Sequence, residues 1–321
     1  MSITRALVRT LAAFVIFAPA TFAATGPYPN KPIRMFTAEI GGGSDFAARL
    51  IGQALAGRIG QQVVVDNRVG GVILGDIAAK ASPDGYNLLL YSGTLWLLPL
   101  MRDSVPYDAF KDFAPITLMG ASPMVLVVHS TVPIRTVKEL IAMANAKPGE
   151  LNCATGPMGA TPHLAAVLFN GMANTHMVLV PYKGVGAAVT DLMGGRVQLM
   201  FPNAGAATPH MKSGRLRGIA VTSAQPSALV PGLPTVAASG VPGYQAVALY
   251  GIFAPQGTPA PILKRVNQEL VAVLHMPDTK EKLLAAGIEA NGSTPEALTS
   301  TMKAEVGRMA KALKSAGVRA E

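Results

Sequence analysis

Two glycine-rich turns hold the residues of this sequence whose types and spacing are best suited to bind a ligand. The first spans residues 40–45 and the second spans residues 155–163, and each stands between an expected strand and an expected helix. Backbone N–H groups at the start of a helix lack partners and the helix dipole is positive there, so such a turn attracts an anion without a charged side chain. Glycine also makes tight turns for purely structural reasons. The pair, one turn in each half of the chain, nevertheless favours an anion-binding cleft.

The spacing of the glycines argues against nucleotide chemistry. The first turn, Gly41-Gly42-Gly43-Ser44, lacks the Gly-Lys-Ser/Thr ending of a phosphate-binding P-loop. It also lacks the G-x-G-x-x-G spacing of a dinucleotide site. Two hydroxyl residues, Ser92 and Thr94, follow the third expected strand. They could donate hydrogen bonds to a ligand, or they could simply open a turn.

The sequence shows no convincing catalytic or metal-binding set. None of the five histidines has the spacing of a metal-ligand pair, and no G-x-S-x-G nucleophile elbow occurs. The single cysteine, Cys153, excludes a disulfide framework and a cysteine metal site. His163 lies near the start of an expected helix, where it could act as an acid or base or could join the loop to the helix. We predict no catalytic residue, no metal and no cofactor.

The first 24 residues have the layout of a secretory signal peptide. Arg5 and Arg9 precede an apolar run over residues 11–20, and small residues follow up to Ala24. The run is too short for a confident membrane span, and no other stretch reaches about 18 uninterrupted apolar residues. We therefore expect export, cleavage between Ala20 and Ala24, and a soluble periplasmic protein that begins near Thr25.

The charge of the chain bears on its partners. The formal net charge is +9, but the basic residues are scattered and aromatic residues are scarce. Nucleic-acid-binding proteins usually gather their basic residues into one patch, so we expect no nucleic-acid partner. A mildly basic body is suited to attracting small anions over long range, although it is equally compatible with an ordinary basic surface.

The hydrophobic pattern alternates between strands and helices in both halves of the mature chain. In the first half the strands cover residues 31–38, 62–66 and 87–91, with helices at 45–59 and 75–81 between them. In the second half the strands cover residues 151–155, 178–181 and 197–201, with helices at 163–171 and 187–193. This order predicts an α/β fold with two similar lobes, each a mainly parallel sheet flanked by helices. Helices at 261–274, 280–286 and 295–316 are expected to return to the first lobe.

Short phrases that occur in order along nearly all of the mature chain carry a family resemblance. The chain resembles the Bug-type extracytoplasmic solute receptors of the tripartite tricarboxylate transporter family. The phrases include Tyr28-Pro-Asn-Lys-Pro-Ile-Arg34, Gly42-Gly43-x-Asp45-x-x-Ala48-Arg49, Val65-Asp-Asn-Arg68, Asp112-Phe-Ala-Pro-Ile116, Gly159-Ala-Thr-Pro-His-Leu164, Val180-Pro-Tyr-Lys-Gly184, Asp191-Leu-Met-Gly-Gly195 and Ala254-Pro-Gln-Gly-Thr-Pro259.

The resemblance implies a two-lobed periplasmic binding protein fold of the type II kind. Lobe 1 would comprise residues 25–128 and 248–321, and lobe 2 would comprise residues 129–247. The chain would cross between the lobes near His129 and again near residues 243–249, which makes a two-strand hinge. The protein would be a monomer that serves integral-membrane transporter subunits on separate chains.

The resemblance also implies a small carboxylate ligand in the cleft, held by backbone amides and ordered waters from the two glycine turns. By resemblance the site would draw on both turns and on two further positions in lobe 2. The two hydroxyls after the third strand join them as candidates because of their position in the sequence. These ligand-binding candidates are Ile40, Gly41, Gly42, Gly43, Ser44, Asp45, Ser92, Thr94, Thr155, Gly159, Ala160, Thr161, His163, Tyr182 and Asn203.

Three departures from the family pattern bear on the ligand. Val167, Pro202 and Ala238 stand where polar residues are usual, which favours a less polar acid, for example an aromatic one, over an amino acid. Two alternatives remain open: an exported hydrolase-like enzyme that uses His163 with Thr161, and a ligand sensor for a signalling system.

Overall fold

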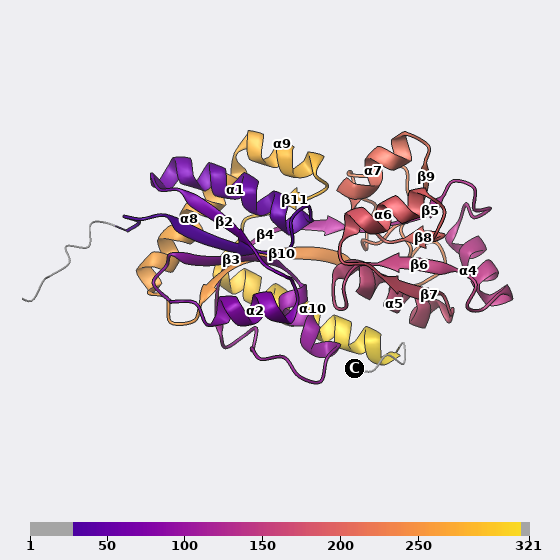
Figure 1. The fold of residues 1–321 in the computed structure, drawn as a ribbon, viewed down its shortest axis with the longest axis horizontal. Coiled ribbons are helices and arrows are strands. Elements are labelled where there is room, and N and C mark those ends of the chain that lie inside the picture. Colours follow the sequence, from indigo (N-terminus) through magenta and orange to yellow (C-terminus); the bar gives the residue numbers. More distant parts are fainter. Residues whose placement is uncertain (1–27, 316–321) are drawn as a thin grey trace, which may run out of the picture.

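The computed structural model describes residues 28–315. These residues form two separate β-sheets, each flanked by helices (Figure 1). The sheets belong to two lobes that lie side by side, and the expected two-lobed α/β fold is confirmed. The expected signal peptide, residues 1–24, lies outside the described residues. Between residues 28 and 315, none of the helices has the length and apolar character needed to cross a membrane.

The first lobe is built on a six-stranded sheet with the order β11-β4-β10-β3-β1-β2. Strands β1, β2 and β3 run parallel, while β10 runs antiparallel to both β3 and β4. The strands are β1 (Ile33–Thr37), β2 (Val63–Asn67), β3 (Asn87–Ser92), β4 (Phe113–Pro123), β10 (Val247–Pro255) and β11 (Glu289–Ala290). The helices of this lobe are α1 (Gly43–Ile59), α2 (Val72–Ala79), α3 (Thr94–Leu97), the 3-10 turn η1 (Leu98–Leu100), α8 (Ala260–His275), α9 (Pro277–Ala285) and α10 (Pro295–Ser315).

The second lobe is built on a five-stranded sheet with the order β7-β6-β8-β5-β9. Strand β6 is parallel to β7 and β8, while β5 is antiparallel to β8 and β9. The strands are β5 (Val125–His129), β6 (Asn152–Thr155), β7 (Val178–Pro181), β8 (Leu199–Met200) and β9 (Leu216–Val221). The helices are α4 (Val137–Ala146), α5 (Thr161–Ala173), α6 (Val185–Met193) and α7 (Ala204–Lys212).

Both sheets are mixed, whereas the sequence predicted mainly parallel ones. The strand–helix–strand units at the start of each lobe are parallel as expected, because a helical crossover returns the chain in the same direction. Most of the difference comes from strands that enter a sheet from the other lobe, and β11 adds a further antiparallel pair with β4. Strand β10 comes back from lobe 2 and inserts between β3 and β4 in the opposite direction to both.

Helix α1 shows why the local sequence folds as it does. Its buried residues Ala47, Ala48, Ile51 and Leu55 recur at helical spacing and face the core. The helix ends at Gly60, whose φ of 71° is the left-handed conformation that glycine adopts without strain. At its start the helix carries no side-chain cap, and this open end is what the site uses.

The chain crosses between the lobes at Met124 and again just before β10. The first crossing lies before the expected position at His129, because β5 pairs only with strands of the second sheet. The Thr222 hydroxyl joins the two crossings: it accepts a hydrogen bond from Met124 N at 2.8 Å and donates to Ala246 O at 2.5 Å. The two connecting segments are therefore held side by side at one point.

Candidate functional site

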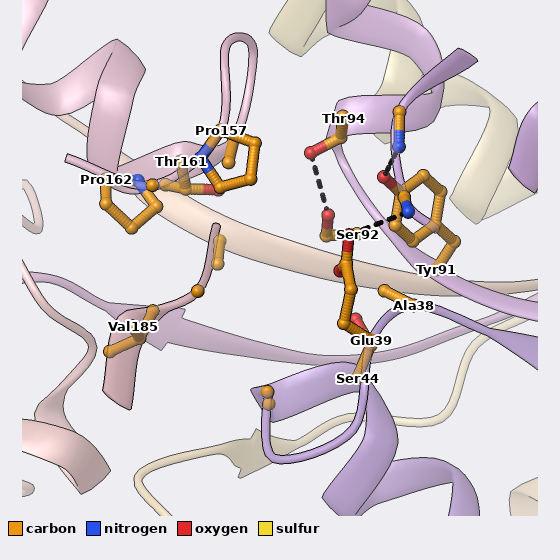
Figure 2. Close-up of a pocket in the computed structure, with 18 of the residues that line it drawn as sticks. Ala38, Glu39, Ser44, Tyr91, Ser92, Thr94, Pro157, Thr161, Pro162 and Val185 are labelled. Atoms are coloured by element: carbon orange, nitrogen blue, oxygen red, sulfur yellow. Dashed lines mark hydrogen bonds between the residues drawn. The ribbon is translucent and has the colours of Figure 1, made fainter. Parts of the chain in front are cut away.

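A cavity of about 570 Å³ lies between the two lobes and takes its lining from both. Figure 2 shows the two sides: Glu39, Ser44, Tyr91, Ser92 and Thr94 come from lobe 1, and the lobe 2 residues face them across the opening. The floor includes Met124, at the first crossing between the lobes. A space of this size and position is typical of a small-molecule site between domains.

Four helices of eight or more residues begin at this cavity without a side-chain cap, two from each lobe. The lining includes the residues at the starts of α1 and α2 in lobe 1, and of α5 and α6 in lobe 2. None of the four N-terminal positions Gly42, Gly71, Ala160 and Gly184 caps its helix with a side-chain hydrogen bond. The positive ends of four helix dipoles therefore border one space, which suits an anion.

The first glycine turn owes its shape to Asp45. This buried carboxylate accepts hydrogen bonds from Gly41 N at 3.0 Å and from Asn67 Nδ2 at 2.8 Å, and it pairs with Arg49 Nε at 2.9 Å. Burial would raise the pKa of Asp45, but the hydrogen bonds from these three partners outweigh it and hold the pKa below its usual value. Asp45 is not one of the lining residues, so it positions the turn from behind.

Close packing also limits what can stand in this turn. A Cβ atom added at Gly43 would lie 2.6 Å from the Tyr250 hydroxyl oxygen and 3.4 Å from Asn203 Nδ2. Tyr250 belongs to β10 and Asn203 caps α7 by accepting from Ala206 N at 2.8 Å, so residues of both lobes meet at this turn. Burial raises the pKa of Tyr250 to about 12, so its hydroxyl stays neutral.

The second glycine turn reaches across to lobe 1. Thr94 Oγ1 donates to Gly159 O over 3.4 Å, and a Cβ atom added at Gly159 would lie 2.6 Å from Leu98 Cδ1. Gly159 N donates to His163 Nδ1 at 3.4 Å, which ties the turn to the first residues of α5. The described structure therefore has the two sides of the cleft in contact at this turn.

Most of the remaining lining is apolar. Leu98, Met124, Pro157 and Met158 contribute side chains, as do Val72, Ile73 and Val185. Two basic residues, Arg102 and Lys183, also line the cavity, and both are exposed to solvent. The site thus combines main-chain donors, an apolar wall and a basic rim.

The predicted site residues fall into two groups. Those that line the cavity are Ile40, Gly41, Gly42, Gly43, Ser44, Ser92, Thr94, Ala160, Thr161 and Asn203. Those outside its lining are Asp45, Thr155, Gly159, His163 and Tyr182. Thr155 is buried in β6, and the Tyr182 hydroxyl donates to Asp191 Oδ2 at 2.8 Å on the flank of lobe 2.

The three apolar departures do not line the cavity either. Val167 is buried in α5, Pro202 is buried beside Asn203, and Ala238 is exposed. Pro202 contributes to the fold through its carbonyl oxygen, which accepts from Val125 N at 2.8 Å. The apolar character of the site therefore comes from the apolar residues that line the cavity, and not from Val167, Pro202 or Ala238.

Several lining residues were not predicted from the sequence. The turns Gly70-Gly71 and Lys183-Gly184 follow β2 and β7 and open α2 and α6, so the rule that selected the first two turns also applies to them. Glu39 lies one residue before the first predicted turn, and its type alone gave no sign that it faces the cavity. The further lining residues missed are Ala38, Val72, Ile73, Tyr91, Leu98, Arg102, Met124, Val185, Gly186, Ala187, Ala248 and Tyr250. Gly156, Pro157, Met158 and Pro162 also line the cavity and belong to the predicted second turn, although they were not among the individual candidates.

Across residues 28–315, no three His, Cys, Asp or Glu side chains are grouped so that they could hold a metal ion. Cys153 is buried in β6, and burial raises the pKa of its thiol well above the usual range. A neutral buried thiol of this kind behaves as a small apolar side chain.

Comparison with known proteins agrees with this architecture. Residues 47–318 match the Tripartite tricarboxylate transporter family receptor profile. Protein BugT of Bordetella pertussis is 35% identical over 298 residues, which cover 91% of each chain. Among solved structures, R. palustris Rpa4515 with adipate has a TM-score of 0.87 at 33% identity and covers 92% of this chain and 100% of its own. MatC from Rhodopseudomonas palustris with bound malate has a TM-score of 0.83 at 26% identity, covering 89% and 100%. The chain therefore belongs to the receptor family of the tripartite tricarboxylate transporters.

Proposed function

We propose that this protein captures a small carboxylate in the cavity between its lobes and delivers it unchanged to a tripartite transporter. The observation that carries the proposal is the meeting of four uncapped helix N-termini at one cavity. Their N–H groups can donate hydrogen bonds to a carboxylate from either lobe, and their dipoles add a positive potential at the cavity. The related proteins that hold adipate and malate support the same ligand class.

The basic rim supports capture of an anion. Arg102 and Lys183 stand on opposite lobes at the cavity and are exposed, so their charges act through solvent on an approaching ligand. Long-range attraction of this kind raises the association rate and weakens as salt is added. The apolar wall then suits a ligand with a hydrocarbon body, such as an aliphatic or aromatic acid.

Closure of the two lobes is the motion that we propose for capture. Lobe 1 would comprise the residues of the first sheet and its helices, lobe 2 those of the second sheet, and the hinge would lie at Met124 and Ala246. A ligand that contacts helix N-termini on both lobes stabilises the closed state more than the open one, which shifts the population toward closure. We further propose that the mature protein is a periplasmic monomer whose signal peptide is removed, and that the membrane subunits are separate chains.

The enzymatic alternative finds no support in the placement of its residues. Thr161 lines the cavity, but His163 does not and instead accepts from Gly159 N. A general base has to reach the proton that it removes, and His163 contacts the turn behind the wall. We therefore propose binding without turnover.

Isothermal titration calorimetry with a series of carboxylic acids and their primary amides tests the proposal. The amide keeps the size and shape of each acid and removes the negative charge that the helix N-termini attract. We expect at least one acid to bind with a tenfold or greater advantage over its amide, about 1.4 kcal/mol. Equal binding of acid and amide throughout the series, or the conversion of a bound acid to a product, would contradict the proposal.

A further inference from the structure

We propose that Glu39 selects ligands with a single carboxylate and a hydrogen-bond donor at the opposite end, and that it disfavours dicarboxylates. This inference rests on the proposed function, because it assumes that a carboxylate occupies the cavity. Among the described residues that line the cavity, Glu39 is the only one with a carboxylate side chain. A negative side chain in an anion-binding site weakens the binding of some anions. Such repulsion can select one ligand over another.

The position of Glu39 is fixed by the main chain beside it. Its Oε1 accepts a hydrogen bond from Gly70 N at 2.8 Å, and the next amide, Gly71 N, donates to the Tyr91 hydroxyl at 2.6 Å. A Cβ atom at Gly70 would lie 3.0 to 3.2 Å from the Tyr91 oxygen and from both Glu39 oxygens, so glycine is what allows this close approach. The carboxylate is therefore held in place and is not a freely moving surface group.

Glu39 retains acceptor capacity that its neighbours do not fill. A carboxylate can accept about four hydrogen bonds, and Gly70 N supplies one. Two of the cavity hydroxyls direct their protons elsewhere, since Ser92 donates to Thr94 at 3.0 Å and Thr94 donates to Gly159 O at 3.4 Å. The Tyr91 hydroxyl, which accepts from Gly71 N, has a single proton and can fill only one further acceptor position of Glu39. A hydroxyl or ammonium group of a ligand can therefore donate to Glu39.

No ion pair between residues 28 and 315 involves Glu39. The cations of the cavity lining, Arg102 and Lys183, are exposed to solvent, which screens their charges. A second carboxylate placed beside Glu39 would therefore meet a like charge without a nearby countercharge, which is strongly unfavourable.

The arrangement also orients the ligand. Figure 2 shows Glu39 on the lobe 1 side, across the opening from Thr161, Pro162 and Val185, which mark the starts of α5 and α6. The ligand carboxylate would bind at these lobe 2 helix N-termini, and its other end would face Glu39. The relatives with adipate and malate hold dicarboxylates, so this chain would differ from them in its choice of ligand within the same class.

The test compares adipate with its ω-hydroxy and ω-amino analogues of equal chain length, together with shorter and longer sets of the same three types. Each set is titrated calorimetrically into the wild-type protein, Glu39→Gln and the control Glu281→Gln. The Gln side chain keeps an oxygen for Gly70 N and removes the charge. Glu281 is exposed on α9 in the same lobe, so its variant makes the same change in net charge far from the cavity.

We expect the wild-type protein and E281Q to bind a hydroxy or amino acid at least tenfold more tightly than the matching diacid. In E39Q this preference should fall at least tenfold, because the diacid gains affinity and the amino acid loses it. If the ω-amino acid loses more than the ω-hydroxy acid, the donor is a cation; equal losses indicate a neutral hydroxyl. Unchanged preferences in E39Q, or a wild-type preference for diacids, would overturn the role of Glu39 while leaving carboxylate capture intact. Binding of no acid by any of the three proteins would refute the proposed function, and this inference with it.

Discussion

Glycine and one buried carboxylate shape the anion-binding turn of lobe 1. Asp45 anchors the turn from inside through Gly41 N, Asn67 and Arg49, while Gly43 allows Tyr250 to pack against the main chain. A side chain at position 43 would therefore act on the ligand site and on the hinge strand β10 together. Gly43 contributes to the site because it has no side chain, which leaves room for the Tyr250 hydroxyl beside the turn.

Substituting Gly43→Ala should lower ligand affinity about tenfold or more, because the new methyl group would lie 2.6 Å from the Tyr250 hydroxyl oxygen and would displace the turn. Gly57→Ala is the matched control, since it lies in the same helix and its Cβ would meet no atom within 4 Å. The control should gain up to about 1 kcal/mol of stability from helix propensity and should keep its affinity. Calorimetry gives the affinities and chemical denaturation gives the stabilities. Equal affinities for the two variants would show that Gly43 is not constrained by Tyr250.

The elements could be predicted where a local pattern determines them. The strand–turn–helix units around α1 and α5 follow from periodicity and glycine position, and the same rule applied to Gly70-Gly71 and Lys183-Gly184 would have found α2 and α6 at the cavity. Strand β4 was missed because Pro115, Gly120 and Pro123 interrupt its pattern, and its partners β10 and β11 lie far along the chain.

Side-chain direction could not be predicted in the same way. Glu39 faces the cavity because its carboxylate accepts a hydrogen bond from Gly70 N, 31 positions away, and no local pattern encodes that pairing. Thr155, Tyr182 and Asp45 lie near the right turns but point into the fold or along its flank. The sequence therefore predicted which turns form the site better than which side chains line it.

The contact between the second turn and lobe 1 leads to a prediction about closure. In Gly159→Ala, the methyl group would lie 2.6 Å from Leu98 Cδ1, so the variant should close less completely and bind ligand several-fold more weakly. Gly149→Ala is the matched control, because Gly149 has a similar φ of 79°, against 77° for Gly159, and no atom lies near its Cβ. Both variants carry the cost of a left-handed alanine, about 1 kcal/mol. Small-angle scattering with saturating ligand should show less compaction for G159A only, and the same compaction in both would contradict the role of this contact.

At the scale of the whole molecule, helix α10 contacts both lobes and lies beside the second hinge crossing. It packs against β4 and α3 of lobe 1 and also against α5 of lobe 2 (Figure 1). Within it, Glu305 is buried and accepts from Trp96 Nε1 at 2.8 Å, while Arg308 of the same helix donates to Gln245 O at 2.8 Å, next to the second crossing. Burial raises the pKa of Glu305 to about 7, although Trp96 and Arg308 both act to lower it.

This raised pKa predicts a pH dependence of stability with a defined sign. The folded protein holds the Glu305 proton more tightly than the unfolded chain, so the stabilising contribution is complete below pH 4.5 and is lost as the pH rises to about 7. Glu305→Gln keeps an acceptor for Trp96 and removes the ionisation. The variant should therefore match the wild type near pH 4.5 and exceed it at pH 8 by up to about 3 kcal/mol, measured by chemical denaturation across this range.

The control for this prediction is Glu296→Gln, which removes the same charge at an exposed position in the first turn of α10. Other groups also titrate across this range, so the informative quantity is the difference between each variant and the wild type at each pH. A difference for E305Q that grows from pH 4.5 to 8, but does not do so for E296Q, assigns the effect to the buried carboxyl under Trp96. A constant difference would show that Glu305 ionises in the folded protein as it does in the unfolded chain. Glu305 would then contribute no pH dependence to the stability of the fold.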